Sequence, residues 1–429
     1  MIKREYLDDQ FELSRNQLIN LNLFWIGVVM YLGGYSLYTI SPSRLSQLLQ
    51  LSSLLLIFWG IVSLIKFKLE NSYLQLLYTL YGLWFLFLFI LGARSFFDKE
   101  FLLYFLLNPL YGGMLYIVPA VLLFPKGPAF YKKAFDAVIL FCVIYILYDF
   151  ISISYLISSD QDNPINIDRV EASFDLGISC GFILLTYRYH STKKKLLALL
   201  TILLILFFAI VRARRGLVLM TIEVILSSYL LYLFYSKKKI LVLYLSVLIL
   251  SLGAFYAANI YNIQKNRIFS FIVERGKEDT RTGVELYFYA DMKPIDWIIG
   301  KGIKGEYYCP DIDENAATNY RGVIETGYLQ IILKGGLVSL VLLILITVPA
   351  IFKGIFYSKN ILSKAAGIWI LLALLSLYPA TVNTFSMRYL LVWISVGICY
   401  SKKIRNIPDE VLKEYFLGKS LPDNNFKFT

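Results

Sequence analysis

Three arginines close together are the feature of this chain best suited to chemistry. Arg212, Arg214 and Arg215 lie between two long apolar runs, residues 196–211 and 217–235. A guanidinium group stays charged at physiological pH and pairs bidentately with phosphate oxygens. Because ionisable groups at membrane depth are costly, they indicate a functional site by default. The cluster therefore predicts an anion site with a pyrophosphate-linked lipid as ligand, and the alternative is an interfacial anchor.

A second polar segment, residues 281–302, belongs to the longest polar loop of the chain. It begins at Arg281, continues as an aromatic-rich amphipathic stretch that contains Trp297, and ends in the turn Gly-Lys-Gly. An indole ring at such a position stacks on the face of a sugar, although tryptophans are also common at membrane interfaces without any ligand. Trp297 is therefore a candidate for glycan binding.

A third segment, residues 321–339, begins at Arg321 and leads into an apolar run. Glu325 and Tyr328 are spaced so that they share one face of a helix. A carboxylate with a suitably raised pKa accepts the proton of an attacking hydroxyl group. We therefore take Glu325 as the candidate general base. The structural alternative is that its charge interacts favourably with a helix N-terminus.

The composition indicates which class of protein positions these side chains. The 429 residues are 58% hydrophobic and 16% aromatic, with a mean hydropathy of +0.63. Repeated apolar stretches of about 20 residues indicate membrane-spanning helices, because spanning strands alternate in polarity. Most lysines lie in short loops, so the positive-inside rule accounts for the net charge of +12. Membrane lipids are therefore expected partners, and nucleic acid is not.

The expected fold is all-α and polytopic, with about twelve membrane-spanning helices of the length that a bilayer requires. These spans are expected near residues 20–40, 49–66, 73–92, 102–124, 135–157, 174–189, 196–212, 215–235, 240–261, 324–352, 362–382 and 386–400. Lysine-rich loops alternate along the chain on the side of the N-terminus, which predicts that both termini are cytoplasmic. Asn108-Pro109 and Gly112-Gly113 interrupt the fourth span and predict a kink or a re-entrant segment.

Four regions are expected along the chain. Residues 1–261 hold the first nine spans, residues 262–323 form a large outer loop that folds as a cap, residues 324–400 hold the last three spans, and residues 401–429 form a cytoplasmic tail. The outer loop has acids and bases in near balance and its own turn signals, as expected of a segment that folds outside the membrane.

The cysteines and the histidine predict neither a metal site nor a cofactor. Three of the four cysteines fall in apolar runs, and no disulfide framework follows from their positions. The single histidine, His190, stands in a lysine-rich loop and is interpreted as an ordinary loop residue.

The order of the second and third segments resembles the superfamily of O-antigen polymerases and O-antigen ligases. The shared order is an arginine, an aromatic-rich helix, a hydrophobic-Gly-x-Gly turn, and then a polar residue followed by Tyr-Leu and a Gly-Gly helix start. The resemblance covers residues 168–339, where Arg169 to Phe174 is similar to the family's Arg-plus-Phe segment. Arg215 matches the family's arginine after the short loop, and Arg281 matches the arginine that opens the cap helix.

The resemblance implies a GT-C-like membrane glycosyltransferase of the bacterial inner membrane. Such an enzyme takes glycan from undecaprenyl pyrophosphate on the periplasmic face, inverts the anomeric centre and uses no metal. Lipid-linked oligosaccharides are then both donor and acceptor, and a chain-length regulator protein is a further candidate partner. The expected catalytic residues are Glu325, Arg215 and Arg281, and the expected substrate contacts are Arg212, Arg214, Arg169, Arg321, Tyr328 and Trp297.

Two departures from the ligase pattern favour a polymerase of surface polysaccharide, such as the O antigen of lipopolysaccharide. Where ligases carry His-Asn the chain has Glu325-Thr326, and where they carry Gly-x-x-Gly it has Gly336 to Ser339. An O-antigen ligase and a protein O-oligosaccharyltransferase remain alternatives. A lipid-linked oligosaccharide flippase is a further alternative, disfavoured because the two halves of the chain show no repeat and the distinctive charges gather near one outer loop.

Overall fold

The structure, a computed structural model, describes most of the chain. The described residues are 13–109, 113–157, 164–212, 214–236, 239–240, 243–244, 251, 281–310, 319–382 and 384–418. The expected span at 240–261 and the first part of the outer loop fall almost entirely outside these residues.

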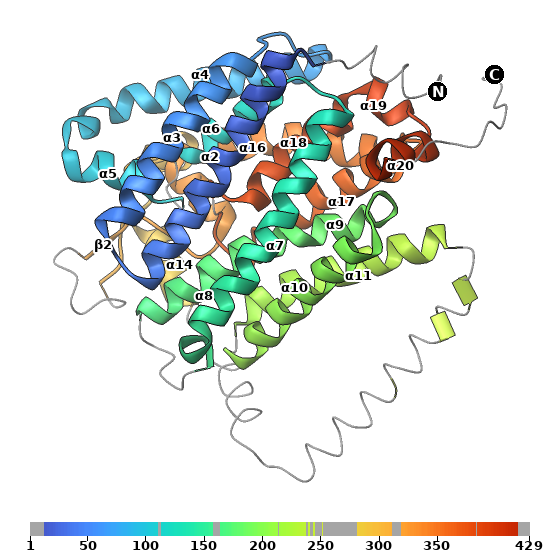
Figure 1. Cartoon of the computed structure of the whole chain (residues 1–429). Coiled ribbons are helices and arrows are strands. Elements are labelled where there is room, and N and C mark those ends of the chain that lie inside the picture. Colours follow the sequence, from blue (N-terminus) through green and yellow to red (C-terminus); the bar gives the residue numbers. More distant parts are fainter. Residues whose placement is uncertain are drawn as a thin grey trace.

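The N-terminal part of the chain is a succession of helices that ends with the hairpin α10–α11 (Figure 1). Its elements are α2 (Arg15–Ile40), α3 (Arg44–Leu64), α4 (Ser72–Gly92), η1 (Ala93–Phe97), α5 (Lys99–Leu107), α6 (Met114–Ile117), η2 (Val118–Leu123), α7 (Pro128–Ile157), α8 (Pro164–Gly177), η3 (Ile178–Cys180), α9 (Gly181–Leu185), η4 (Tyr187–Tyr189), α10 (Thr192–Val211) and α11 (Arg215–Tyr235).

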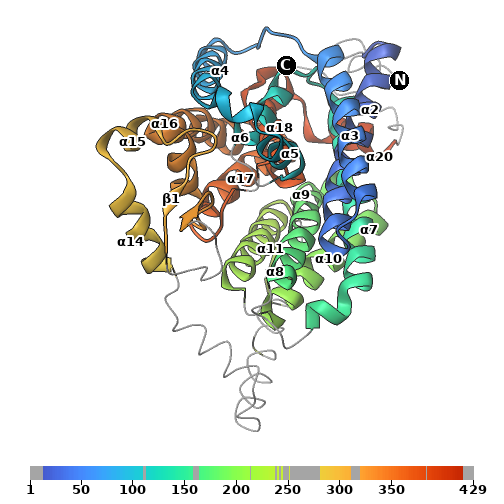
Figure 2. The ribbon, with the colours of Figure 1, turned by 90° about the vertical axis from the view of Figure 1, so that its left-hand side faces the viewer.

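The C-terminal part begins with a small polar unit, made of its first two helices and its two strands, and continues with long apolar helices. Its elements are α14 (Arg281–Asp291), α15 (Pro294–Ile299), β1 (Tyr307–Tyr308), β2 (Tyr320–Arg321), α16 (Gly327–Phe356), α17 (Ile361–Leu375), α18 (Met387–Tyr400), α19 (Lys402–Asn406) and α20 (Asp409–Leu417). The strands β1 and β2 form an antiparallel pair, with Tyr307 opposite Arg321. Figure 2 shows α14 and α15 beside α16, on the opposite flank from α2 and α3.

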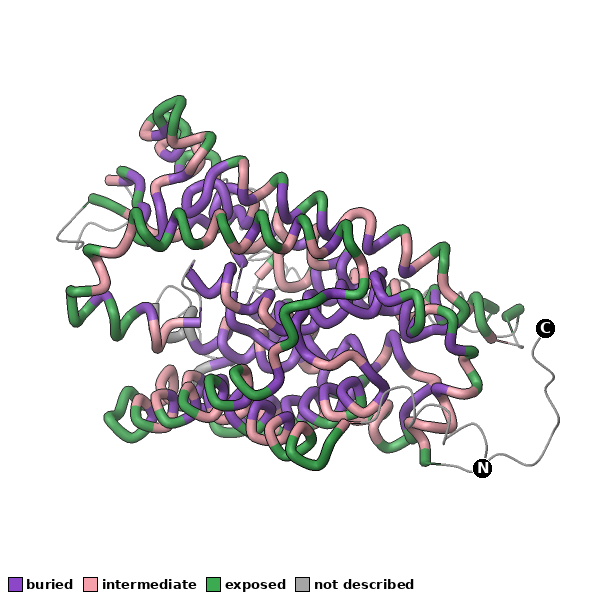
Figure 3. Tube along the Cα trace, turned by 90° about the horizontal axis from the view of Figure 1, so that it is seen from above, coloured by how far each residue is buried: buried purple, intermediate pink, exposed green. Residues whose placement is uncertain are grey.

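The all-α membrane fold is confirmed at the level of its helices. Seven helices among the described residues are long and apolar enough to cross a bilayer, and three further apolar helical segments are shorter. Exposed residues follow the outer helices of the bundle (Figure 3). Many of them are leucine, isoleucine and phenylalanine, as expected of surfaces in contact with lipid. The expected spans at 102–124 and 174–189 are each divided into short helical pieces. The count of twelve spans therefore stays a prediction.

The break in the expected fourth span follows from its proline and glycines. Helix α5 ends at Leu107, and the Pro109 carbonyl oxygen accepts hydrogen bonds from the Phe385 amide at 2.9 Å and the Thr384 hydroxyl at 3.0 Å. After the break the chain packs back against α5 at Gly113, where an added Cβ would lie 2.0 Å from the end of the Phe105 ring, so a larger residue would require this ring to move.

Helix α16 is kinked where the polar unit docks against it. Gly336 has φ 66° inside the helix, and a Cβ at this position would lie 2.0 Å from the Ile298 carbonyl oxygen of α15. The Lys301 amide donates to the Leu333 carbonyl at 2.7 Å, and the Trp84 indole donates to the Gly335 carbonyl at 3.0 Å. The Gly-Gly pair therefore opens the helix so that α15 and its turn can insert, which positions the whole polar unit.

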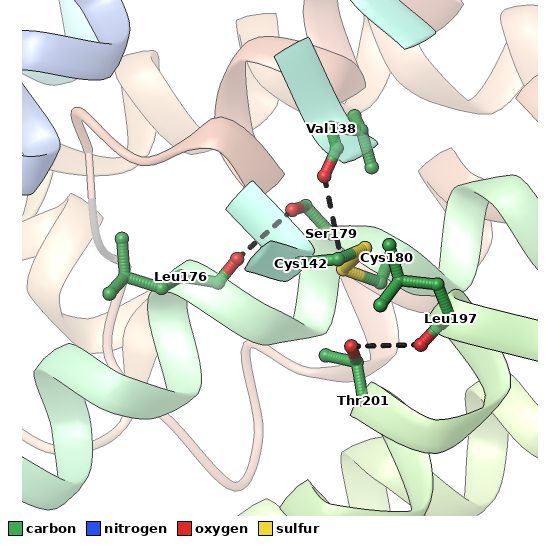
Figure 4. Close-up of a disulfide and its surroundings, with 7 residues drawn as sticks. All are labelled: Val138, Cys142, Leu176, Ser179, Cys180, Leu197 and Thr201. Atoms are coloured by element: carbon green, nitrogen blue, oxygen red, sulfur yellow. Dashed lines mark hydrogen bonds between the residues drawn. A yellow bond between two sulfur atoms is a disulfide. The ribbon is translucent and has the colours of Figure 1, made fainter. Parts of the chain in front are cut away.

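A disulfide joins two helical segments in the interior. Cys142 of α7 is bonded to Cys180 of η3, and both side chains are fully buried (Figure 4). The cysteine positions in the sequence did not predict this bond. Their positions in two apolar runs gave no sign of the contact, because it depends on how α7 packs against η3. Cys309 and Cys399 are free.

Candidate functional site

The starts of three helices meet at the connection between α17 and α18, residues 376–386. The Gly327 amide at the start of α16 donates to the Leu377 carbonyl at 2.8 Å. At the start of α11, a Cβ on Gly216 would lie 2.7 Å from the Pro379 carbonyl oxygen. At the start of α14, Arg281 donates from Nη2 to the same Pro379 oxygen at 2.7 Å. We call this place the α17–α18 junction.

Two of the expected catalytic residues form an ion pair at this junction. The Nε atom of Arg281 lies 3.3 Å from Oε2 of Glu325. The side chains are 38% and 58% exposed, so the pair is open to solvent and to a ligand. An exposed ion pair contributes only about 0–1 kcal/mol to stability. The fold therefore has little structural need for this contact.

A second contact runs parallel to the ion pair and involves a carboxylate that sequence reasoning did not assign. The Thr326 hydroxyl donates to Oε1 of Glu285, which lies one helical turn after Arg281 on α14. Arg281 and Glu285 thus face Glu325 and Thr326 as two adjacent pairs. In the sequence, Glu285 could have been identified by its position four residues after Arg281, on the same face of an amphipathic helix.

The arginine cluster is divided between the two helices of the α10–α11 hairpin. Arg212 follows the last residue of α10 and its side chain is 2% exposed, whereas Arg215 is the first residue of α11 and is exposed. The Arg214 amide donates to the Ala209 carbonyl at 2.9 Å, which holds the turn closed. Because Gly216 abuts Pro379, Arg215 belongs to the α17–α18 junction. The helix N-terminus beside it carries a partial positive charge that favours an anion.

Arg169 serves a different part of the molecule. It is buried on α8, and its Nε and Nη2 atoms donate to the Thr39 carbonyl at 3.1 Å and the Ile40 carbonyl at 2.9 Å. These are the last carbonyls of α2, which a helix leaves without internal partners. The structure thus gives Arg169 a helix-capping role at α2.

The aromatic candidates are mostly engaged within the polar unit. The ring of Trp297 stacks on Tyr289 with centroids 6.0 Å apart and meets Phe288 edge-on. Tyr307 is buried opposite Arg321, and burial raises its pKa to about 12 while the arginine opposes that shift. Tyr328 packs against this same core on the first turn of α16. The polar unit therefore has its own aromatic core, and Trp297 belongs to it.

A further charged group lies among the helices, and sequence reasoning did not single it out. Arg388 at the start of α18 interacts electrostatically with Asp175 of α8 and Glu223 of α11, and its Nη1 atom lies 3.2 Å from the Met220 sulfur. A lone arginine at the edge of an apolar run was the only signal. No three His, Cys, Asp or Glu side chains gather as metal ligands in the described part of the chain.

The structure thus brings Arg215, Arg281, Glu325 and Tyr328 to the ends of helices that meet at one junction. A scan against protein-family models and searches of curated proteins and of solved structures found no match to this chain.

Proposed function

We propose that this protein is a membrane glycosyltransferase that polymerises surface polysaccharide from oligosaccharide repeats carried on undecaprenyl pyrophosphate. The observation that supports the proposal best is the Arg281–Glu325 pair, placed where the starts of α11, α14 and α16 converge. A cation that recognises phosphate and a carboxylate that accepts a proton are the two groups that the reaction needs. In the proposed orientation this junction faces the periplasm, and the enzyme resides in the bacterial inner membrane.

The arginines take the donor's pyrophosphate. Arg215 and the first amide groups of α11 approach the junction from one side, and Arg281 approaches it from α14. When the donor binds, Arg281 exchanges the exposed Glu325 carboxylate for a pyrophosphate oxygen. Negative charge grows on the pyrophosphate as its bond to the sugar breaks, so arginines that hold it most tightly in the transition state lower the barrier.

Glu325 takes the proton of the acceptor. The acceptor hydroxyl oxygen attacks the anomeric carbon of the donor glycan, the bond from that carbon to the pyrophosphate oxygen breaks, and the hydroxyl proton passes to the released Glu325 carboxylate. Lipid pyrophosphate leaves with the electron pair of the broken bond. Attack on the face opposite the leaving group inverts the anomeric centre. General-base assistance of this kind is worth about 10²–10⁴-fold in rate.

The distribution of charge supports the proposed sidedness. Basic segments meet at the end of the bundle away from the junction: the Lys66 amide bonds the Leu123 carbonyl, the Lys359 amide bonds the Arg405 carbonyl, and Arg188 pairs with Asp409 at 2.5 Å. Lys and Arg collect on the cytoplasmic side of membrane proteins. The proposal therefore assigns that end to the cytoplasm and the α17–α18 junction to the periplasm.

One observation favours a second candidate, a transporter of lipid-linked oligosaccharide. Arg388, Asp175 and Glu223 place charge among the helices, and transporters carry such groups near the bilayer midplane. An O-antigen ligase and a protein O-oligosaccharyltransferase would use the same donor site with another acceptor.

The test is deletion of the gene followed by analysis of surface glycan and of the lipid-linked pool. A polymerase predicts single-repeat glycan at the surface, and an Arg281→Ala copy should fail to restore long chains. Full repeats retained on the inner leaflet would indicate the transporter. Long chains that accumulate unattached on the lipid carrier would indicate the ligase.

A further inference from the structure

A cavity of about 340 Å³ lies between α5 and the loop that precedes α16. Small-molecule sites typically have volumes of about 300–1,000 Å³. Phe101, Gln330 and Lys334 are buried in its floor, while Tyr104 and Glu306 are exposed at its rim. Neither the arginine cluster nor Arg281 lines it.

The floor of this cavity is held by hydrogen bonds to the backbone on two sides. Lys334 donates from Nζ to the Gly305 carbonyl at 2.9 Å, and Gln330 accepts through Oε1 from the Ile324 amide at 2.9 Å. These bonds fix the loop before β1 and the loop after β2 against α16. The cavity is therefore preformed, which reduces the ordering cost of binding a ligand.

The lining chemistry suits a neutral, hydroxyl-rich molecule. The carboxylates of Asp98, Glu100 and Glu306 outnumber the ammonium groups of Lys304 and Lys334, so a strongly anionic ligand such as pyrophosphate is disfavoured. Carboxylates accept hydrogen bonds from hydroxyl groups, and ammonium groups donate to them.

An aromatic ring and an amide complete the set. The exposed Tyr104 ring offers a flat apolar face. The Gln330 amide already bonds the Ile324 amide and the Gly322 carbonyl, and it keeps one further donor hydrogen and one further acceptor position. We propose that this cavity is a saccharide-binding subsite that holds the acceptor glycan.

The position of the cavity relates it to the candidate base. Val323 lines the cavity, and Glu325 is two residues further along the same chain. Two residues span at most about 7 Å, so the wall of the cavity lies within that distance of the Glu325 backbone. The assignment to the acceptor rests on the proposed function, whereas saccharide binding by the cavity does not.

Gly322 allows the cavity to be filled without breaking the fold. A Cβ at this position would lie 3.7 Å from Cγ of Glu306 and 3.8 Å from Nζ of Lys334, which are ordinary contact distances. Its backbone also lies outside the left-handed region, so a larger side chain fits the backbone and points between these two groups. Gly322→Phe should occupy the space that a sugar ring would take.

The experiment measures saccharide binding without turnover. Purified full-length protein is titrated with one-repeat oligosaccharides cut from the surface polysaccharide of the encoding cell, and binding is followed by saturation-transfer NMR and calorimetry. We expect Gly322→Phe and Tyr104→Ala each to raise the Kd for the oligosaccharide by about 10-fold or more. A 10-fold increase is a loss of about 1.4 kcal/mol of binding free energy. Arg281→Ala and Tyr357→Ala, the latter an exposed tyrosine at the other end of α16, should bind as the wild type does.

Three results would overturn the proposal. They are unchanged affinity in Tyr104→Ala together with every folded Gly322 variant, loss of binding in Arg281→Ala instead, and absence of oligosaccharide binding by folded wild-type protein. If Gly322→Phe does not fold, Tyr104→Ala alone tests the proposal, because removal of an exposed ring leaves the fold intact. Binding that depends on the cavity in a protein that does not polymerise lipid-linked repeats would keep the subsite and remove the proposed function.

Discussion

Arg281 and Glu325 are separated by 44 residues in the sequence, yet Nε of the arginine lies 3.3 Å from Oε2 of the glutamate. The contact joins the start of α14 to Glu325, which lies two residues before the first residue of α16. Because Arg281 also binds the Pro379 carbonyl at 2.7 Å, the guanidinium group connects three segments of the chain.

Arg281→Lys should abolish most of the polymerisation while the protein remains folded and abundant. Lysine keeps the charge but lacks the planar pair of donors that contacts both Glu325 and Pro379. Removing one preorganised transition-state donor costs about 10²–10³-fold in turnover, and we expect a loss in this range. The measurement is turnover of purified enzyme with lipid-linked repeat. Arg94→Lys, an exposed arginine of η1, is the matched control and should leave turnover unchanged.

Gly216→Val should displace the junction and lower both stability and turnover. A Cβ at this position would lie 2.7 Å from the Pro379 carbonyl, which is backbone and cannot move aside freely. Overpacking of this kind typically costs about 1–3 kcal/mol. Thermal unfolding in detergent and turnover report the two effects. Gly82→Val on α4, where no atom lies within 4 Å, is the control, and equal losses in the two variants would argue against a specific contact at Pro379.

His190 should make the protein sensitive to acid. Burial lowers its pKa to about 3, whereas an unfolded chain has a histidine pKa of about 6.5. Between these values the unfolded chain binds a proton that the folded chain excludes, so stability is present above pH 6.5 and is lost as the pH falls toward 3. His190→Gln keeps an acceptor near Thr186, which lies 2.9 Å from Nε2.

The measurement is the free energy of unfolding between pH 6.5 and pH 4 for both proteins. The wild type should lose up to about 1.4 kcal/mol more per pH unit than His190→Gln. Since the chain has a single histidine, the difference reports this residue alone. Parallel profiles would show that His190 is accessible to protons in the folded state.

Transfer should proceed in excess chelator. The prediction rests on the arginines, which supply the positive charge that a metal provides in other phosphate-releasing enzymes. Purified protein with lipid-linked repeat should elongate it at the same rate with and without chelator. Activity that disappears with chelator and returns with Mg²⁺ would direct attention to Asp311, Asp313 and Glu314, which lie outside the described residues.

Individual candidate residues could be chosen from the sequence because their signals are local. An arginine or a carboxylate at the edge of an apolar run stands out by polarity alone, as Arg215 and Glu325 do. The all-α class could likewise be predicted from the length of the apolar runs. The kink at Gly335-Gly336 was visible as a motif, but its cause, the insertion of α15, was not.

The partners of these residues were not predictable, because they depend on packing between distant segments. Pairing of Arg281 with Glu325 requires that α14 dock along the kinked α16, and the Cys142–Cys180 bridge requires α7 and η3 to be neighbours. Arg169 matched a motif yet caps α2, because a cation near an apolar run has the same sequence signature whether it binds a ligand or a helix end.

The most direct test of the account is the chain-length distribution that purified Glu325→Gln makes from a defined lipid-linked repeat. If Glu325 accepts the acceptor's proton, the amide keeps the shape and the contact with Arg281 but lowers turnover by about 10²–10⁴-fold, while donor affinity stays close to that of the wild type. Glu285→Gln, which still accepts from Thr326, is the matched control and should retain most turnover. A long-chain product formed by Glu325→Gln at the wild-type rate would contradict the account and remove Glu325 from the mechanism.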